Sequence, residues 1–276
     1  MIRQILGKGR RAPLSVASEN DGLQEDVGRT QPSATDALPL IRLQQLTKRF
    51  GWIPALQDVS CELHGGQIVA ILGANGSGKS TLLKLCAGLL RPSEGNIQVA
   101  GWQLPKEAAQ VRAHIGYAGH EIFLDESFTI QENLSFFAHC YGSAGKLRVD
   151  HSLGRLGLAK FAELAVRQLS RGRQQLVDIA RATLHGPELL LLDEPLNHLD
   201  VVAEDVVVQM MKDARDSGSL ILWVTHESSR VAAIADRVLL LHAGRLVVDE
   251  AGQVAETDWP ATLKATLCQE MMNRSA

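Results

Sequence analysis

Short apolar runs with the length of strands alternate along this chain with longer segments of helical spacing. The strand-type runs lie at 40–43, 67–72, 97–99, 189–192, 220–224 and 238–241. The last three are separated by helical segments, which is typical of parallel strands joined by crossover helices. The runs at 40–43 and 97–99 flank the run at 67–72 and predict antiparallel strands beside it. The pattern therefore predicts an α/β fold with a mixed sheet core and an antiparallel β subdomain.

A different texture separates the two groups of strand-type runs. From about 121 to 172, apolar residues such as Ile130, Leu134 and Phe137 recur at spacings of three and four residues. Such spacing places apolar side chains on one face of a helix. We therefore expect a small helical subdomain in this part of the chain.

The two ends of the chain lie outside this pattern. Residues 1–38 mix small and polar residues with little periodicity, which predicts a disordered extension. Its first eleven residues are basic and free of acid, like the start of an organelle transit peptide, but acidic residues follow by position 19, so we expect a plain tail. At 256–276 apolar residues repeat at i, i+4 and i+8 and predict a terminal amphipathic helix. The main domain is expected over 39–255.

Composition limits the classes of protein that agree with this sequence. The chain has 276 residues, 45% of them hydrophobic, which suits a globular protein with one main domain. Its formal net charge of −3 gives no overall basic field, so we expect no nucleic-acid partner. No apolar run approaches the roughly 18 residues of a membrane helix. The 4 cysteines are far apart without a C-x-x-C pair, which favours a reducing, cytosolic compartment.

The segment after the run at 67–72 carries the strongest chemical signal. It reads Gly73-Ala74-Asn75-Gly76-Ser77-Gly78-Lys79-Ser80-Thr81 and matches the pattern G-x-x-x-x-G-K-[ST]. Glycines let backbone N–H groups point at phosphate oxygens, Lys79 can neutralise the β- and γ-phosphates, and the Ser80 hydroxyl can bind Mg²⁺. We expect this loop to hold a nucleoside triphosphate and Mg²⁺, with a helix from Thr81 onward. The alternative is a glycine-rich turn that binds nothing.

Two adjacent carboxylates end the apolar run at 189–192. Asp193 and Glu194 are expected at the carboxyl end of that strand, where ligands bind in open α/β sheets. Asp193 suits a contact to Mg²⁺ through a water, and Glu194 suits orientation or deprotonation of the water that attacks the γ-phosphate. The alternative is a strand end with two solvated acids.

Four further segments resemble motifs of one family and occur in that family's order. They are Lys48-Arg49-Phe50-Gly51, Leu169-Ser170-Arg171-Gly172-Arg173-Gln174-Gln175, Leu196-Asn197-His198-Leu199-Asp200 and Val224-Thr225-His226-Glu227. With the phosphate loop and the acidic pair, they resemble the adenine-stacking aromatic, LSGGQ signature, D-loop and switch histidine of ABC nucleotide-binding domains. The resemblance covers about 40–250 and implies a P-loop NTPase fold that binds and hydrolyses ATP.

The resemblance also implies a dimer, because two such domains of this family pair head to tail around two ATP molecules. It implies that Phe50 stacks on adenine, that His226 holds the γ-phosphate and the attacking water in line with Glu194, and that Asp200 braces the interface. The signature residues expected to face the partner's ATP are Ser170, Gly172, Arg173 and Gln175. A monomer would be nearly inactive, and the partner would be a second copy or a related ABC ATPase.

Two departures from the family pattern affect the expected site. Arg171 and Arg173 replace the usual Gly and Gln of the signature and add positive charge beside the partner's phosphate. This charge either strengthens ATP capture or is simply solvated, and for Arg173 we favour a contact with phosphate or ribose. The family's Q-loop glutamine is expected about forty residues after Lys79, where this chain has His120. A histidine binds water or metal only when neutral, so coupling through His120 is expected to depend on pH.

Two short motifs narrow the comparison within the family. The segments 115–120 and 128–134 resemble the Gly-His and T-x-x-E-N-L pattern of the haem-exporter ATPases of cytochrome c maturation. They imply an exporter subunit docked at the cytoplasmic face of the cell membrane on separately encoded membrane subunits. The alternative is a soluble ABC ATPase in translation or complex assembly, which the N-H-L-D segment at 197–200 favours. Those proteins usually hold two cassettes, whereas only one phosphate loop occurs here.

Overall fold

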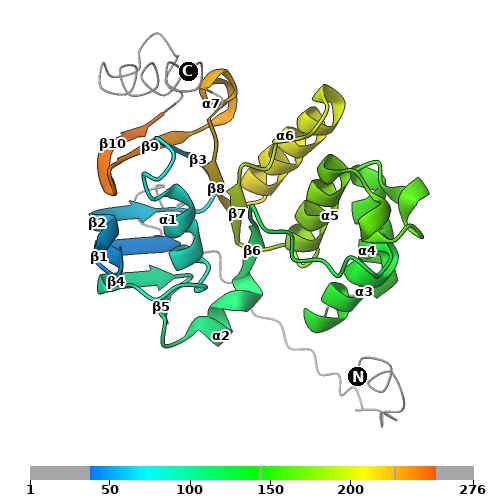
Figure 1. The fold of residues 1–276 in the computed structure, drawn as a ribbon, viewed down its shortest axis with the longest axis horizontal. Helices are drawn as coiled ribbons and strands as arrows, with labels where there is room; N and C mark the ends of the chain where they lie inside the picture. Colours follow the sequence, from blue (N-terminus) through cyan, green and yellow to red (C-terminus); the bar gives the residue numbers. More distant parts are fainter. Residues whose placement is uncertain (1–37, 143–144, 227, 253–276) are drawn as a thin grey trace, which may run out of the picture. The chain divides into compact units, whose positions relative to one another are not determined.

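The computed structural model describes residues 38–142, 145–226 and 228–252. The strands are β1 (Ile41–Phe50), β2 (Ile53–Leu63), β3 (Gln67–Leu72), β4 (Glu94–Val99), β5 (Trp102–Leu104), β6 (Ile115–Ala118), β7 (Leu189–Asp193), β8 (Leu220–Val224), β9 (Arg237–His242) and β10 (Arg245–Ala251). The α-helices are α1 (Lys79–Cys86), α2 (Ala108–Val111), α3 (Ile130–Cys140), α4 (Gly145–Arg155), α5 (Arg171–Thr183), α6 (Val201–Asp216) and α7 (Ser228–Ile234) (Figure 1). The predicted extension up to residue 37 and the predicted helix at 256–276 lie outside the described residues.

Four strands form an antiparallel sheet in the order β2-β1-β4-β5. β1 lies in the middle, with Ile41 opposite both Leu63 of β2 and Val99 of β4. Buried and exposed positions alternate over the second half of β2, because one face of this sheet packs on a core. The predicted antiparallel strands are confirmed, and the runs at 40–43 and 97–99 are parts of longer strands.

Six strands form the second sheet in the order β10-β9-β3-β8-β7-β6. Neighbouring strands from β9 to β6 run parallel, and β10 is antiparallel to β9. The parallel strands predicted at 189–192, 220–224 and 238–241 are confirmed as β7, β8 and β9. Every residue of β7 and β8 is buried, as expected for parallel strands with both faces covered. The predicted mixed α/β fold is correct.

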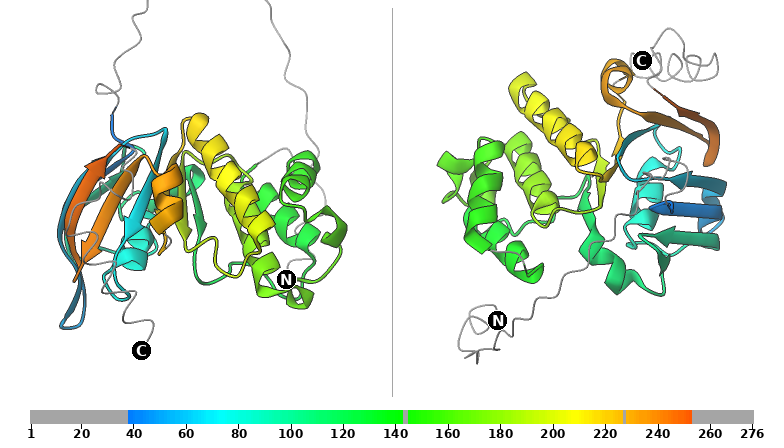
Figure 2. Two further views of the ribbon diagram at one scale, coloured as in Figure 1. Left: turned by 90° about the horizontal axis from the view of Figure 1, so that it is seen from above. Right: turned by 180° about the vertical axis from the view of Figure 1, so that it is seen from behind.

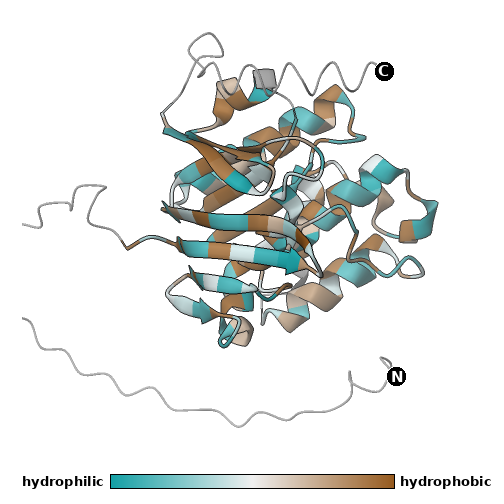
Figure 3. Cartoon of the chain, turned by 60° about the vertical axis from the view of Figure 1, so that its left-hand side comes forward, coloured by the Kyte–Doolittle hydropathy of each residue, from teal (hydrophilic) through white to brown (hydrophobic). Residues whose placement is uncertain are grey.

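Successive side chains of the parallel strands enter two different hydrophobic cores. Ala70 of β3 faces the core that contains the apolar residues of α5. Its neighbours Val69 and Ile71 face the core that contains α1 and the antiparallel sheet. Figure 3 shows the matching alternation of hydrophobic and hydrophilic residues along the antiparallel strands. Helices α1 and α5 therefore cover opposite faces of the six-stranded sheet.

Helices α3 and α4 form the helical part that the spacing predicts. Thr129 caps α3 with a capping box, in which its side chain accepts from Glu132 N and the Glu132 side chain accepts from Thr129 N. Ile130 and Leu134, which define the predicted spacing, are both 0% exposed. Both views of Figure 2 show α3 and α4 grouped on the side away from the antiparallel sheet.

A stacked pair of rings joins the end of α3 to the loop after α5. The rings of Tyr141 and His185 lie 3.9 Å apart with an angle of 8° between their planes. His185 Nε2 lies 3.2 Å from the carbonyl oxygen of Ile115, at the start of β6. Burial lowers the pKa of His185 from 6.5 to about 4. The folded protein therefore keeps this imidazole neutral at pH values where the unfolded chain protonates it.

We expect the free energy of unfolding to fall as the pH is lowered from 6.5 to about 4. In that window the unfolded state takes up a proton at His185 that the folded state refuses, which costs up to about 1.4 kcal/mol of stability per pH unit. His185→Gln keeps a donor for the Ile115 carbonyl and should make this slope shallower. Urea unfolding across the window measures the slope, and the exposed His151→Gln serves as the control. Equal slopes for wild type and His185→Gln would contradict the assignment.

Candidate functional site

The predicted phosphate loop connects β3 to α1 in a conformation that requires its glycines. Gly73, Gly76 and Gly78 have φ angles of 143°, 79° and 106°, in the left-handed region that glycine tolerates. A Cβ at Gly73 would lie 2.1 Å from the Leu241 carbonyl oxygen, and one at Gly78 would lie 2.4 Å from that of Ala55. Close backbone packing therefore fixes the loop. Helix α1 begins at Lys79, two residues before the predicted start at Thr81.

Lys79 closes the loop from inside. Its side chain is buried, and Nζ donates to the carbonyl oxygens of Gly73 and Ala74 at 2.5 and 2.9 Å. Within the loop, the Ser77 backbone N–H donates to the Ala74 carbonyl oxygen at 3.0 Å. Asn75 and Gly76 lie at the exposed tip of the loop. The ammonium group is therefore held against two carbonyl oxygens at the start of the loop.

Ser80 and Asp193 come together where β7 ends beside α1. Asp193 is 4% exposed, and burial raises the pKa of its carboxyl group, although a hydrogen bond from the Ser80 hydroxyl acts in the opposite direction. Thr81, the next residue, is half-buried in the first turn of α1. The structure therefore places one hydroxyl and one carboxylate oxygen side by side at the base of the phosphate loop.

Glu194 and His226 are in direct contact although 32 positions separate them. Glu194 Oε1 lies 2.6 Å from His226 Nε2, and the other oxygen accepts from Asn197 Nδ2. Glu194 has a φ angle of 53°, and its backbone N–H donates to the Val224 carbonyl oxygen at 2.9 Å. The hydrogen bond from His226 lowers the pKa of the Glu194 carboxyl group. The carboxylate is therefore held ionised at the ends of β7 and β8.

Phe50 ends β1 on the surface, where 50% of its area is exposed. Lys48 Nζ lies 5.0 Å from the centre of the Phe50 ring and also donates to the Arg91 carbonyl oxygen at 2.8 Å. One face of the ring therefore carries a cation–π contact. The rest of its exposed area is available to a planar ligand.

The predicted signature residues lie at the start of α5. Ser170 caps the helix, and its hydroxyl accepts from Arg173 N at 3.5 Å. Gly172 packs against the loop after β7, because a Cβ there would lie 2.3 Å from the His198 carbonyl oxygen. The Arg173 guanidinium stacks 4.1 Å from the centre of the Phe161 ring. Gln175 is 5% exposed and lies inside the protein, so its side chain is not on the surface that a partner would meet.

Asp200 and His120, the two residues predicted to couple the site to a partner, lie in the segments on either side of the start of α5. Asp200 caps α6, and its side chain accepts from Ala203 N at 2.9 Å. His120 follows β6 and is exposed, and its carbonyl oxygen accepts from Arg171 Nη2 at 2.8 Å. Neither role is tested by these contacts, and both stay predictions.

The sequence alone missed three residues that organise the site. Asn197 was interpreted only as part of the D-loop, but its side chain holds Glu194. Asp178 and Arg181 form a buried ion pair at 2.8 Å within α5. The spacing of three residues between opposite charges was a visible signal for that pair. No local pattern pointed to the contact between Asn197 and Glu194.

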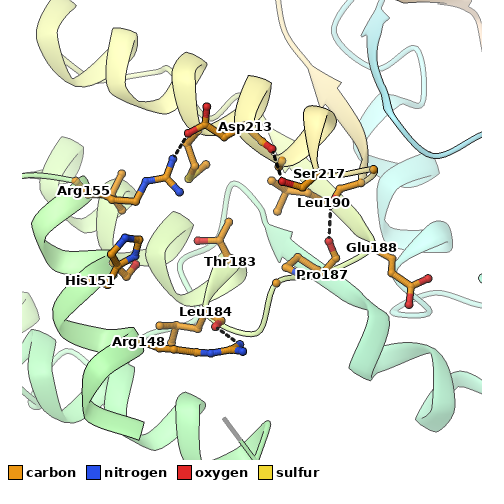
Figure 4. A pocket seen from close by; sticks show the side chains of 17 residues that line it. Arg148, His151, Arg155, Thr183, Leu184, Pro187, Glu188, Leu190, Asp213 and Ser217 are labelled. Atoms are coloured by element: carbon orange, nitrogen blue, oxygen red, sulfur yellow. Dashed lines mark hydrogen bonds and ion pairs between the residues drawn. The ribbon is translucent and has the colours of Figure 1, made fainter. Parts of the chain in front are cut away.

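A cavity of about 700 Å³ lies away from all of these residues. It opens between α4, α6 and the amino ends of β7 and β8 (Figure 4). Arg155 reaches across it to Asp213 at 2.5 Å, and Arg148 donates to the Leu184 carbonyl oxygen at 3.3 Å. Its described lining contains none of the predicted nucleotide residues, which lie at the carboxyl ends of the strands. The cavity is therefore separate from the candidate site.

Comparisons with known proteins agree with this arrangement. The family model described as ABC transporter matches residues 56–197. The chain is 34% identical over 216 residues to the ABC transporter ATP-binding protein NatA of Bacillus subtilis, covering 75% of this chain and 88% of that protein. It is 35% identical over 232 residues to the pyoverdine export ATP-binding/permease protein PvdT of Pseudomonas aeruginosa, covering 79% of this chain and 35% of that protein. It spans about half the length of two relatives from Methanosarcina mazei and Methanosarcina acetivorans.

A solved structure shows the same fold with its products bound. A dimeric, post-hydrolysis ATP-binding cassette bound to ADP and Pi superimposes with a TM-score of 0.71 at 29% identity, covering 76% of this chain and 98% of that one. Among the described residues, no helix of this chain is long and apolar enough to cross a membrane.

The fold, the glycine loop around Lys79 and the acidic strand end define an ATP-binding and ATP-hydrolysing enzyme of the P-loop class. The family match and the relatives make the assignment narrower. The chain belongs to the ABC transporter family and is an ATP-binding subunit of that family. The predictions of ATP binding and of ATP hydrolase activity are confirmed.

Proposed function

We propose that this domain pairs head to tail with a second copy or a related subunit, so that each ATP lies between one phosphate loop and the partner's signature segment. The observation that carries this proposal is that α1 and α5 cover opposite faces of the six-stranded sheet. Within one chain, Ser170 at the start of α5 is therefore across the sheet from the helix that begins at Lys79. A second domain supplies the missing half of the site.

In this dimer, the phosphate loop binds ATP in its own domain. The loop's backbone N–H groups and Lys79 surround the β- and γ-phosphates, and Lys79 leaves its two carbonyl partners for phosphate oxygens. Phe50 stacks on the adenine with the exposed part of its ring. These roles use a buried charge and an exposed aromatic surface that the free domain already holds in place.

Hydrolysis depends on the contact between Glu194 and His226. Glu194 accepts a proton from the attacking water, and His226 turns from the carboxylate to the γ-phosphate when ATP is present. Asn197 keeps the second oxygen of Glu194 in place during this exchange. Closure of the dimer excludes other water from the site.

The partner's contribution comes from the first turn of α5. The Ser170 hydroxyl and the Gly172 backbone contact the γ-phosphate of the other domain, where the N-terminal dipole of α5 favours negative charge. Arg173 is exposed beside them and can reach phosphate or ribose if it leaves the Phe161 ring. Asp200 braces the interface from the start of α6. Gln175 supports the helix from inside rather than touching the nucleotide.

The side chains at the base of the loop fit Mg²⁺. The Ser80 hydroxyl and the Asp193 carboxylate are adjacent, and the desolvated carboxylate gains from a divalent cation. Mg²⁺ takes few protein oxygens and completes its shell with phosphate and water. Bound there, the ion would neutralise negative charge on the β- and γ-phosphates. Ser80 and Asp193 would hold the ion at the base of the loop.

We place the subunit at the cytoplasmic face of a membrane, where ATP drives export through separate membrane subunits. Capture of the tagged chain from detergent-solubilised membranes, followed by measurement of its ATPase rate, tests this. We expect a polytopic membrane protein to co-purify and to raise the rate of hydrolysis. Co-purification of ribosomes without a membrane protein would support the translation alternative instead.

Haem export for cytochrome c maturation is the narrower proposal for the cargo. The segments 115–120 and 128–134 support it, and in the fold they lie on β6 and at the capped start of α3. Deletion of the protein from its host should then abolish covalent haem attachment to c-type cytochromes. Normal attachment after deletion would exclude this cargo and leave the ATP-binding role unaffected.

A further inference from the structure

The first turn of α5 contacts loops on two sides within its own chain. On one side, Arg171 Nη2 donates to the carbonyl oxygen of His120 at 2.8 Å. On the other side, Gly172 packs so closely on the His198 carbonyl that a Cβ would lie 2.3 Å from it. His120 lies two residues after the end of β6, and His198 belongs to the loop that follows Glu194. The helix turn that carries Ser170 therefore contacts two loops of its own domain, the loop after β6 and the loop after β7.

Two buried side chains further along α5 contact residues 117–123, the segment that contains His120. Asp178 Oδ1 accepts from Phe123 N at 3.2 Å, and Arg181 Nη2 donates to the Tyr117 carbonyl oxygen at 2.5 Å. Asp178 is 0% exposed and Arg181 is 7% exposed. Because both side chains are buried and form an ion pair with each other, their hydrogen bonds fix the segment 117–123 to the middle of α5. Arg171 extends the attachment to the exposed end of the helix.

The dipole of its own helix does not favour Arg171 at this position. A cation in the first turn is disfavoured by the positive end of the helix dipole, and α5 has no acidic residue there. The Arg171 guanidinium is exposed, and its hydrogen bond goes to the neighbouring segment rather than to α5. Arg171 therefore connects the start of α5 to the backbone of His120, against the unfavourable helix dipole.

We propose that Arg171 is a positioning residue that links the two nucleotide sites of the dimer. The inference depends on the proposed head-to-tail pairing. Ser170 meets the partner's nucleotide, and Arg171 ties the turn that carries Ser170 to the backbone of His120 in its own site. When Ser170 contacts the nucleotide bound by the partner, Arg171 holds the His120 loop of its own nucleotide site in place. Closure of one site therefore favours closure of the other.

The test uses Glu194→Gln protein, which is expected to bind ATP but to hydrolyse it very slowly. Arg171→Ala in that background should raise the monomer–dimer dissociation constant about tenfold, the value of one charge-assisted hydrogen bond. ATP affinity measured on dilute monomer should not change. Arg171→Lys should restore most of the dimer, because an ammonium also donates to a carbonyl. Hydrogen exchange at 119–122 should increase in Arg171→Ala and stay unchanged in the core strands.

The control is Arg167→Ala, which removes an exposed arginine from the same region, one whose side chain makes no hydrogen bond or ion pair among the described residues. Dimerisation of Arg171→Ala equal to that of its parent would overturn the linking role. A rise in exchange throughout α5 and the core, without rescue by lysine, would also overturn it and assign Arg171 to stability alone. If Glu194→Gln formed no ATP-dependent dimer, the proposed pairing would fail first, and this inference with it.

Discussion

Glu194→Gln is expected to lower the rate of ATP hydrolysis about a thousandfold, within the range that loss of a general base produces. The amide cannot accept a proton from water, but it has nearly the shape of the carboxylate and can still accept from Asn197 Nδ2. Nucleotide binding should therefore persist, and ATP should trap a dimer. Phosphate release measures the rate, and light scattering with and without ATP measures the dimer.

A carboxylate at the other end of the same strand provides the matched control. Glu188 precedes β7, is exposed, and pairs with His114 at 2.8 Å, away from the nucleotide loop. Glu188→Gln should therefore leave hydrolysis within about twofold of wild type, as for most surface changes. Hydrolysis that persists in Glu194→Gln would show that Glu194 is not the general base and would leave His226 as the candidate for that role.

Lys79→Ala is expected to weaken ATP binding about a hundredfold, the loss that follows removal of one partner from a buried charge contact. The effect falls on binding itself, in contrast to Glu194→Gln, because Lys79 contacts phosphates in the ground state as well as during hydrolysis. The variant should also lose some stability, since the carbonyl groups of Gly73 and Ala74 would lose their donor. Calorimetry with ATP and with ADP gives the affinities.

Lys84→Ala is the control for this substitution, because Lys84 lies in the last turn of the same helix and is only half-buried. Its removal should leave ATP affinity unchanged. Equal affinities for wild type and Lys79→Ala would contradict the proposed role of the loop, whatever the rate of hydrolysis.

The sequence predicted the fold well where one physical requirement dominated. The apolar run of β7 predicted a buried strand, because it is continuous but too short for a buried helix and ends in two acids and a proline. The spacing of Ile130 and Leu134 had to be a helix with one buried face. The helix α1 begins at Lys79, two residues before the prediction, because the loop passes directly into the helix after Gly78.

The candidate site was predicted residue by residue, but not the contacts between its residues. The motif order identified Glu194 and His226, and the fold brought Nε2 to 2.6 Å from the carboxylate. The same order suggested that Gln175 would face a partner, whereas the helix turns this side chain inward. Arg171 looked like added charge for a phosphate, but its guanidinium is engaged with the His120 carbonyl.

The sequence by itself determined the class of strand and helix, the phosphate loop and the family, because these depend on local conformation and on the order of motifs along the chain. Only the tertiary structure decided that α1 and α5 lie on opposite faces of one sheet and that His226 Nε2 lies 2.6 Å from Glu194 Oε1. Such contacts join residues through the packing of distant elements. Local propensity does not encode them, since each depends on where the rest of the chain places its partner.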